Sequence, residues 1–378
     1  MNESEDIRIL KEITNFTIML KNNENVTCCT SMTNNRLAVA LKEGHVIIWD
    51  LLKNEVLLRM CNPVEANEHV INKEHAMIIS MCQTGEYTLA CRINNFYNNN
   101  ILLLNFEDEF VNTRCILTEP IQKNIETQWN SLIINIDSSW YPNNQIECLN
   151  NYIVFTTLDK YIDVMDLETL VTHKFKASGD HEITFSIVDN KLIIGSSQYI
   201  TFESKDETHI PCGILETLNF DDVYDKNIKY IKNIVHFQKI VQMDLYNIIV
   251  IEHPVKLKTS DAHSNYITIR DALTFKLINT ICIKSPHHNL YGSIIKDVVW
   301  LGHNYIAVLM FYTVIIYDIL TETTIRIIDR VVPEMLSFGN GVTSLIDLKD
   351  GKFATVSNHN VITVYNCKFD MLKNYLNK

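Results

Sequence analysis

The sequence of 378 residues lacks the local motifs that mark most enzymes. It has only ten glycines, and none of them forms a glycine-rich loop of the kind that cradles a phosphate group. It contains no serine nucleophile elbow and no HExxH helix motif. We therefore expect a protein that is not an enzyme, with no catalytic residue and no cofactor.

Cysteine is present but not in the patterns that staple a small domain or hold a metal. None of the ten cysteines forms a CxxC pair, and no His/Cys group has zinc-ligand spacing. Cys28, Cys82 and Cys91 lie in or beside apolar stretches, where a free thiol behaves as a small apolar group. We expect no metal site, and a reducing compartment, the nucleus or cytoplasm.

Long apolar runs and an excess of positive charge are also missing. No stretch approaches the roughly 18 apolar residues of a membrane span, and Met1–Asp6 is too polar and acidic to begin a secretory signal. Lys and Arg number 33 against 45 Asp and Glu, a net charge of −12. That balance disfavours nucleic acid and anionic membranes as partners. Lys226, Lys229 and Lys232 are expected to form a solvated edge.

What the chain does have is clearest between Arg36 and Met60. Two apolar runs, Leu37–Leu41 and Val46–Trp49, flank a tight turn, and a third run, Val56–Met60, follows Trp49-Asp50 and a polar turn. Such short runs of β-branched, aliphatic and aromatic residues between turn residues predict strands joined by hairpins.

Weaker copies of this pattern of strands and turns recur along the chain. Each copy has a strand that ends in an acidic or amide residue: Val46–Asp50, Ile101–Asn105, Ile162–Asp166, Tyr199–Glu203, Ile267–Asp271, Val314–Asp318 and Val361–Asn366. Short apolar strands precede them and most are followed by a polar turn and another strand. Four-stranded units repeating every 40–50 residues or so, without helices, predict an all-β, seven-bladed β-propeller. An eight-bladed count stays open, and the second and fourth blades have the weakest signals.

The Trp49-Asp50 dipeptide and its degenerate copies resemble the WD-repeat propeller family over nearly the whole chain. Only the first unit has the full dipeptide, and Gly302-His303 falls in a hairpin between two strands instead of the family's Gly-His position. These departures from the family's pattern imply that the buried Asp-His-Ser-Trp network of strong WD repeats is not formed here. The blades would then be held mainly by apolar packing.

We expect one propeller domain over residues 1–378. In the resembled family a terminal strand completes the last blade, and here Ile13–Leu20 and Met371–Tyr375 compete for that place, with the N-terminal segment favoured. Three long connections are predicted, at Ile121–Gln145 with Trp129 and Trp140, at Glu216–Lys239, and at Pro254–Ser264.

The hairpins between the second and third strands of each blade line one rim of the ring in the resembled family. Aromatic and charged side chains gathered on a rim suit a protein interface. The candidate partner-binding residues here are Lys42, Glu43, Asp159, Lys160, Phe311, Tyr312 and His359. Phe311 and Tyr312 are the strongest, unless they pack against a neighbouring blade. Asp244 and Asp347, on inner strands, are expected to be structural.

These features favour a non-enzymatic scaffold, a WD-repeat subunit of a multiprotein complex whose partners are other proteins. The alternative is a reader of a basic or modified peptide, which Phe311 and Tyr312 would hold at the channel mouth with acids such as Glu43 and Asp159 nearby. A phosphoinositide-binding propeller is disfavoured, since the family that binds these lipids carries an Arg-Arg pair that this chain lacks. Insertion into a membrane is not expected.

Overall fold

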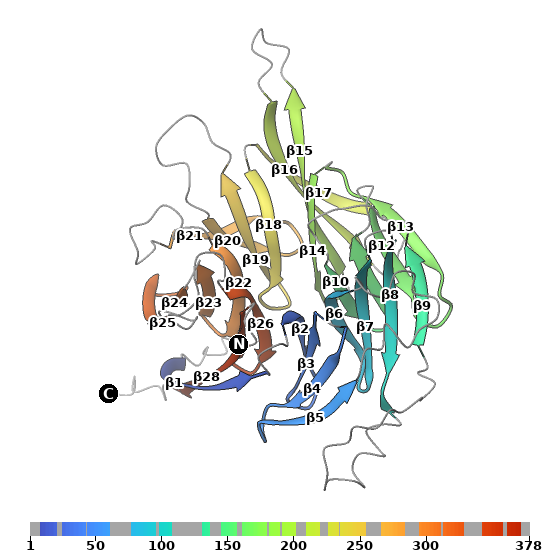
Figure 1. Cartoon of the computed structure of the whole chain (residues 1–378). Helices are drawn as coiled ribbons and strands as arrows, with labels where there is room; N and C mark the ends of the chain where they lie inside the picture. Colours follow the sequence, from blue (N-terminus) through green and yellow to red (C-terminus); the bar gives the residue numbers. More distant parts are fainter. Residues whose placement is uncertain are drawn as a thin grey trace, which may run out of the picture. The chain divides into compact units, whose positions relative to one another are not determined.

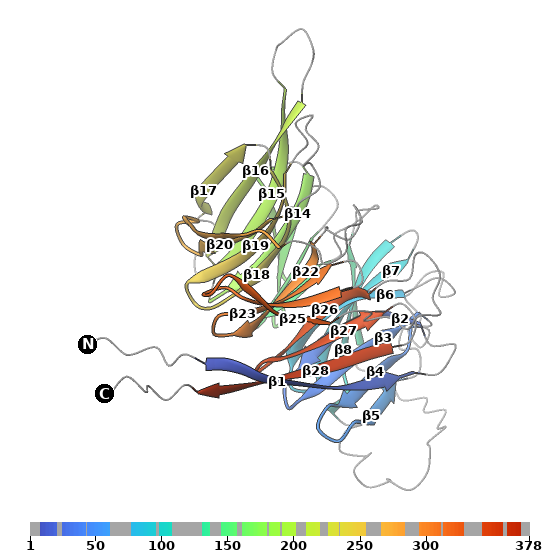
Figure 2. The ribbon, with the colours of Figure 1, turned by 90° about the vertical axis from the view of Figure 1, so that its left-hand side faces the viewer.

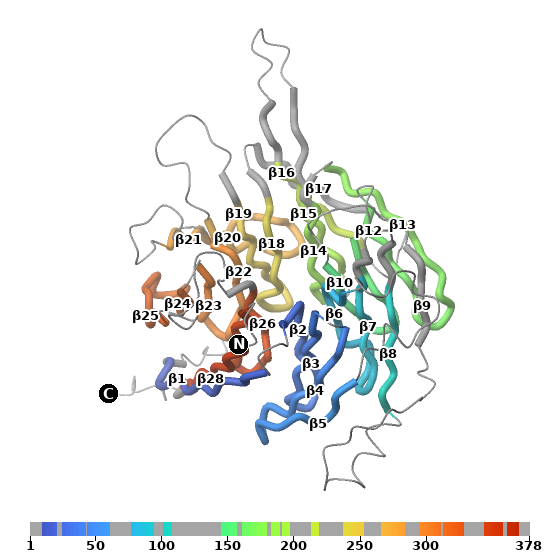
Figure 3. Tube along the Cα trace, viewed as in Figure 1, coloured from blue at the N-terminus to red at the C-terminus, as the bar shows by residue number. Residues whose placement is uncertain are grey.

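The computed structural model describes most of the chain in segments (Figure 3). The described residues are 8–20, 25–42, 44–60, 77–95, 98–107, 131–136, 145–156, 161–179, 181–189, 191–201, 209–219, 226–233, 235–254, 266–283, 295–310, 313–328, 342–357 and 361–371. Among them, no helix has the length and apolar character needed to cross a bilayer.

The described residues form 28 strands in seven four-stranded antiparallel sheets. The fold is a seven-bladed β-propeller, which confirms the predicted fold class and blade count. The chain divides into two compact units, a larger one of residues 22–283 and a smaller one of residues 1–21 with 284–378. The assignment of a single domain stays a prediction.

The larger unit holds five blades, each built from strands that follow one another in the chain (Figure 1). They are β2 (Val26–Met32), β3 (Arg36–Leu41), β4 (Val46–Asp50) and β5 (Glu55–Met60); β6 (Met77–Gly85), β7 (Thr88–Asn95), β8 (Asn98–Asn105) and β9 (Ser131–Ile136); β10 (Ile146–Leu149), β11 (Tyr152–Thr156), β12 (Tyr161–Asp166) and β13 (Thr172–Lys176); β14 (His181–Val188), β15 (Lys191–Thr201), β16 (His209–Asn219) and β17 (Lys226–Asn233); and β18 (Val235–Gln242), β19 (Asn247–Pro254), β20 (Tyr266–Asp271) and β21 (Leu277–Ile281).

The smaller unit holds the sixth and last blades. The sixth blade has β22 (Ile295–Gly302), β23 (Tyr305–Met310), β24 (Thr313–Asp318) and β25 (Thr323–Ile328), and the last has β26 (Val342–Lys349), β27 (Lys352–Ser357), β28 (Val361–Met371) and β1 (Arg8–Met19). β1 runs antiparallel beside β28 (Figure 2), with partners from Arg8↔Met371 to Met19↔Val361. An N-terminal strand therefore completes the last blade, and Met371 belongs to β28.

The repeated acidic residue of the sequence pattern forms the turn between the third and fourth strands. In four blades its Oδ1 accepts hydrogen bonds from the backbone N–H groups two and three residues further on, as in Asp271 to Leu273 (3.1 Å) and to Thr274 (2.6 Å). The same pattern occurs at Asp50, Asp166 and Asp318. The residue four positions after each Asp has a positive φ, the left-handed conformation that closes hairpins of this kind. These residues are Asn54, Leu170, Phe275 and Glu322.

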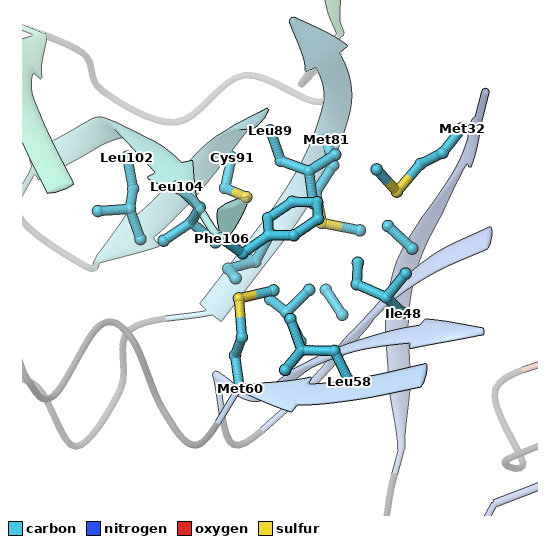
Figure 4. Close-up of a cluster of buried hydrophobic side chains, with 14 of the residues drawn as sticks. Met32, Ile48, Leu58, Met60, Met81, Leu89, Cys91, Leu102, Leu104 and Phe106 are labelled. Carbon is cyan, nitrogen blue, oxygen red and sulfur yellow. The ribbon is translucent and has the colours of Figure 1, made fainter. Parts of the chain in front are cut away.

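The blades pack through buried apolar side chains. In the cluster between the first and second blades, Phe106 is fully buried among side chains that include Met60, Met81 and Leu104 (Figure 4). Similar clusters join the second to the third, the third to the fourth and the fourth to the fifth blade, and the sixth to the last. Trp49 stabilises the hairpin that follows it, since its Nε1 donates a hydrogen bond to Asn54 Oδ1 at 3.2 Å.

Three sequence predictions about strands and loops were wrong. Tyr199–Glu203 is not a third strand: β15 continues to Thr201, and all eleven of its residues pair with β16. Glu216–Lys239 is not one loop, because β16 ends and β17 and β18 lie within it.

The predicted connection Ile121–Gln145 contains β9, the outer strand of the second blade. The two outer strands that were missed, β9 and β17, are stabilised by cross-strand pairing that a local pattern of residues does not show. Trp129, Trp140 and residues 255–264 of the third predicted connection lie outside the described residues.

Neighbouring residues of β1 allow a matched test of how the last blade is completed. Ile18 is 1% exposed and Met19 is 75% exposed. We expect Ile18→Ala to lower the free energy of unfolding by roughly 2–5 kcal/mol, because it removes a buried side chain, and Met19→Ala to change it by no more than about 0.5 kcal/mol. Urea denaturation measures both, and equal effects would contradict the pairing of β1 in this register.

The described cysteines are free thiols of contrasting exposure. Burial raises the pKa of Cys28 and of Cys367 to about 12, whereas Cys282 is exposed. Because the thiolate is the reactive form, we expect a maleimide at neutral pH to modify Cys282 at least about tenfold faster than Cys367 in the folded protein. Peptide mapping by mass spectrometry measures both rates, with the urea-unfolded chain as the control in which the difference disappears.

Candidate functional site

The predicted partner-binding rim falls mostly on residues that the structure does not describe. Lys42 is exposed in the turn after β3, and its N–H donates to the Asn25 carbonyl oxygen at 2.7 Å. The other six candidates lie outside the described residues: Glu43, Asp159, Lys160, Phe311, Tyr312 and His359. Their joint role as an interface stays a prediction.

Asp244 and Asp347 are both engaged in turns. Asp244 Oδ1 accepts from the N–H groups of Tyr246 and Asn247, each at 2.7 Å, and it lies beyond the end of β18, not on the inner strand. Asp347 accepts from the N–H of Lys349 at 2.8 Å and from its Nζ at 2.6 Å. These contacts are structural, as the sequence analysis expected.

Buried charge in the fifth blade forms a closed network between β19 and β20. Glu252 Oε1 accepts hydrogen bonds from Arg270 Nη2 at 2.9 Å and from Thr268 Oγ1 at 2.6 Å. The Arg270 Nη1 group donates to the Phe275 carbonyl oxygen at 3.0 Å, which ties the network to the hairpin that begins at Asp271. The two charged side chains are 1% and 2% exposed. The network positions the fifth blade's hairpin.

A second buried carboxylate joins the third blade to the fourth. Glu216, on β16, accepts from the N–H of Ser178 at 2.9 Å and from its hydroxyl at 2.5 Å. Next to it, Ser196 on β15 accepts from the N–H of Gly179 at 3.0 Å. Both acceptors hold the segment that follows β13, so this network is also structural. Among the described residues, no group of three or more His, Cys, Asp or Glu side chains could hold a metal ion.

The feature best suited to binding is an exposed apolar patch on the fifth blade. Leu245 and Tyr246, in the turn before β19, are 61% and 73% exposed, and Leu273, in the turn before β21, is 50% exposed. The Ala272 N–H donates to the Tyr246 carbonyl oxygen at 2.6 Å, so the two turns lie side by side. Leu277 and Ile278, on β21 of the same blade, are also exposed, at 46% and 57%. We call these five residues the blade-5 apolar surface.

This surface stands out from the rest of the described chain. Each other blade exposes at most three large apolar side chains among its described residues. Single exposed apolar residues are normal, but a contiguous group on a folded protein usually marks an interaction site.

The outer edge of the same blade is uncharged. β21 pairs with β20 alone, and its sequence, LINTI, has no charged residue. The other outer strands with fully described side chains, β5, β13 and β25, all carry Lys, Arg or Glu. Because charges on an edge strand discourage pairing with another chain, the β21 edge is the one of these four that is suited to an added strand.

Sequence reasoning missed the blade-5 apolar surface. It placed Asp244 on an inner strand, but β18 ends at Gln242, and both Asp244 and Leu245 lie in the turn. The available signal was the presence of Leu245, Tyr246 and Leu273 at hairpin turns, where polar residues and glycine are usual. These turns join the first strand to the second and the third strand to the fourth, whereas the rim was predicted at the hairpins between second and third strands.

The paired buried charges of the fifth blade yield a test. We expect Arg270→Met alone to lower the free energy of unfolding by roughly 3–5 kcal/mol, since it leaves Glu252 buried without its cation. The double variant Glu252→Met/Arg270→Met should lose much less, because both charges are removed together. Thermal and urea unfolding of the three proteins measure this coupling, and losses that simply add would show that the two groups do not interact.

Comparison with known proteins identifies the fold but no family. No family model matches the chain, and no curated protein matches it. Among solved structures, it is similar to the crystal structure of Chaetomium thermophilum Raptor, with a TM-score of 0.60 and 12% sequence identity over 95% of this chain and 30% of that one. At this identity the likeness shows the fold alone. Since 1105 chains match, the fold does not select a function.

Proposed function

We propose that this protein is a non-enzymatic interaction scaffold, a WD-repeat-like subunit of a multiprotein complex that binds protein partners. The blade-5 apolar surface carries this proposal, because its five large apolar side chains are all at least 46% exposed. Covering them with an apolar partner removes that area from water, at a gain of roughly 25 cal/mol per Å² before the costs of association.

The two turns that present the surface are held in place before any partner binds. Asp244 fixes the turn of Leu245 and Tyr246 through two backbone hydrogen bonds, and Asp271 does the same for Leu273. A preorganised turn loses little conformational entropy on binding. Tyrosine is also among the residues that contribute most to interface energies, so Tyr246 is the expected anchor.

The chemistry of the surface favours a partner with an uncharged, apolar face. The five side chains carry no charge, and the carboxylates of Asp244 and Asp271 are occupied by the turns. The neighbouring β21 edge suits an extended, uncharged segment of that partner as an added strand.

Location and charge supplement the proposal. The buried free thiols of Cys28 and Cys367 support a reducing compartment, the nucleus or cytoplasm. The net charge of −12 supports protein partners over nucleic acid or anionic membranes. Reading of a basic or modified peptide through Glu43 and Asp159 stays a prediction, because both residues lie outside the described part of the chain.

Affinity purification from the native cells, followed by quantitative mass spectrometry, tests the scaffold function. We expect a stoichiometric partner whose recovery falls at least about tenfold with Tyr246→Ala/Leu273→Ala, since truncating anchor residues weakens interfaces by more than about 1 kcal/mol each. The matched control is Leu52→Ala/Val56→Ala, at two exposed apolar residues of the first blade (71% and 45% exposed).

A direct measurement with the purified partner completes the test. Hydrogen exchange should slow in residues 243–246 and 272–281 when the partner is added to the full-length protein, and not in the turn of Leu52. If no partner co-purifies, or if both double variants retain it equally, the proposed surface is wrong.

A further inference from the structure

The second blade contains a buried cation, Arg92, that has no counter-ion among the residues that the structure describes. Arg92, on β7, is 4% exposed. Its Nη1 donates to Thr156 Oγ1 on β11 of the third blade at 3.1 Å. Its Nε–H is buried and has no hydrogen-bond acceptor among the residues that the structure describes. No carboxylate in the described part of the chain forms an ion pair with this guanidinium.

Arg270 is a buried arginine of the same fold whose partners are in place. Its Nε and Nη2 both donate to Glu252 Oε1, at 3.2 and 2.9 Å, and its Nη1 reaches a carbonyl oxygen. Leaving a buried charge without such partners is costly, because the group has lost its hydration and gained no attraction in return. Burial lowers the pKa of Arg92 to about 10, so the guanidinium is still a cation at neutral pH.

Arg92 lies near the end of its strand, beside the end of a strand of the third blade. It is three residues from the end of β7, and Thr156 is the last residue of β11. Both strands lead into the hairpins that join the second and third strands of their blades. The bond to Thr156 holds Nη1 toward the third blade, which leaves Nε and Nη2 as the edge that binds an oxyanion with two parallel hydrogen bonds.

We propose that Arg92, oriented by Thr156, binds an oxyanion, the carboxylate or phosphate group of an acidic or phosphorylated side chain on a protein partner. The anion supplies the acceptor for Nε–H and the charge that the cation lacks. This site is independent of the blade-5 apolar surface, since it lies on other blades, and it needs no whole partner to be detected.

Small anions test the site on the full-length protein. Thermal unfolding is followed while acetate or inorganic phosphate replaces chloride at constant ionic strength and pH. We expect a saturable rise in the unfolding midpoint, as binding to the folded state alone requires. The rise should persist in Arg59→Met, a control at an exposed arginine of β5, and the apparent affinity should fall at least about tenfold in Arg92→Met, which removes the charged hydrogen bonds.

Thr156→Val provides a second variant, because it removes the hydroxyl that orients Arg92 but keeps the cation and the side-chain volume. We expect it to weaken anion binding and, because Arg92 loses its acceptor, also to lower the midpoint in chloride, so each variant's response to an anion is measured from its own midpoint in chloride. A response to acetate indicates a carboxylate ligand, and a response to phosphate alone indicates a phosphorylated one. The same non-saturable response in wild type, Arg92→Met and Thr156→Val, or no response to either anion, would overturn the site. Neither result bears on the scaffold, whose test uses other residues.

Discussion

Burial of both faces of each sheet is the constraint on which this structure depends. In β3 and β23 every residue is buried, although successive side chains of a strand point to opposite faces. A sheet with two apolar faces must be covered on both, so no blade is stable without its neighbours. Apolar clusters between consecutive blades meet this requirement within each compact unit. The same constraint explains the short, nearly continuous apolar runs of the sequence.

Such an interior makes each buried polar group informative. Hydrogen bonds from neighbouring strands and connections surround Glu216 and the pair Glu252 and Arg270. A structural role therefore explains why these charged groups are buried. Arg92 is different, because its Nε has no acceptor among the described residues. On the surface, it is the exposed apolar groups that are informative. Apolar side chains at the turns of the fifth blade, such as Tyr246, contribute nothing to a core and are available to a partner.

The sequence was sufficient for the strands that are buried on both faces. Val46–Asp50 was assigned with the bounds that β4 has, and Val314–Asp318 differs from β24 by one residue. It failed for outer and extended strands, as at Tyr199–Glu203, where the length of β15 is set by pairing with β16. It found the turns that follow Asp50, Asp166, Asp271 and Asp318 but not their hydrogen bonds, since an acidic residue such as Asp271 looks the same whether it binds a ligand or its own turn.

The sequence by itself determined the fold class, the number of blades and the turn positions, because these follow from a local alternation of apolar runs and turn residues. Only the tertiary structure decided which side chains matter at the surface and in the interior. Arg92 meets Thr156 across 64 residues of chain, and Tyr246 lies beside Ala272 only because two hairpins of one blade are adjacent. The exposure of a side chain and the pairing of its charge depend on residues that are distant in the sequence, so a local pattern of residues cannot reveal them.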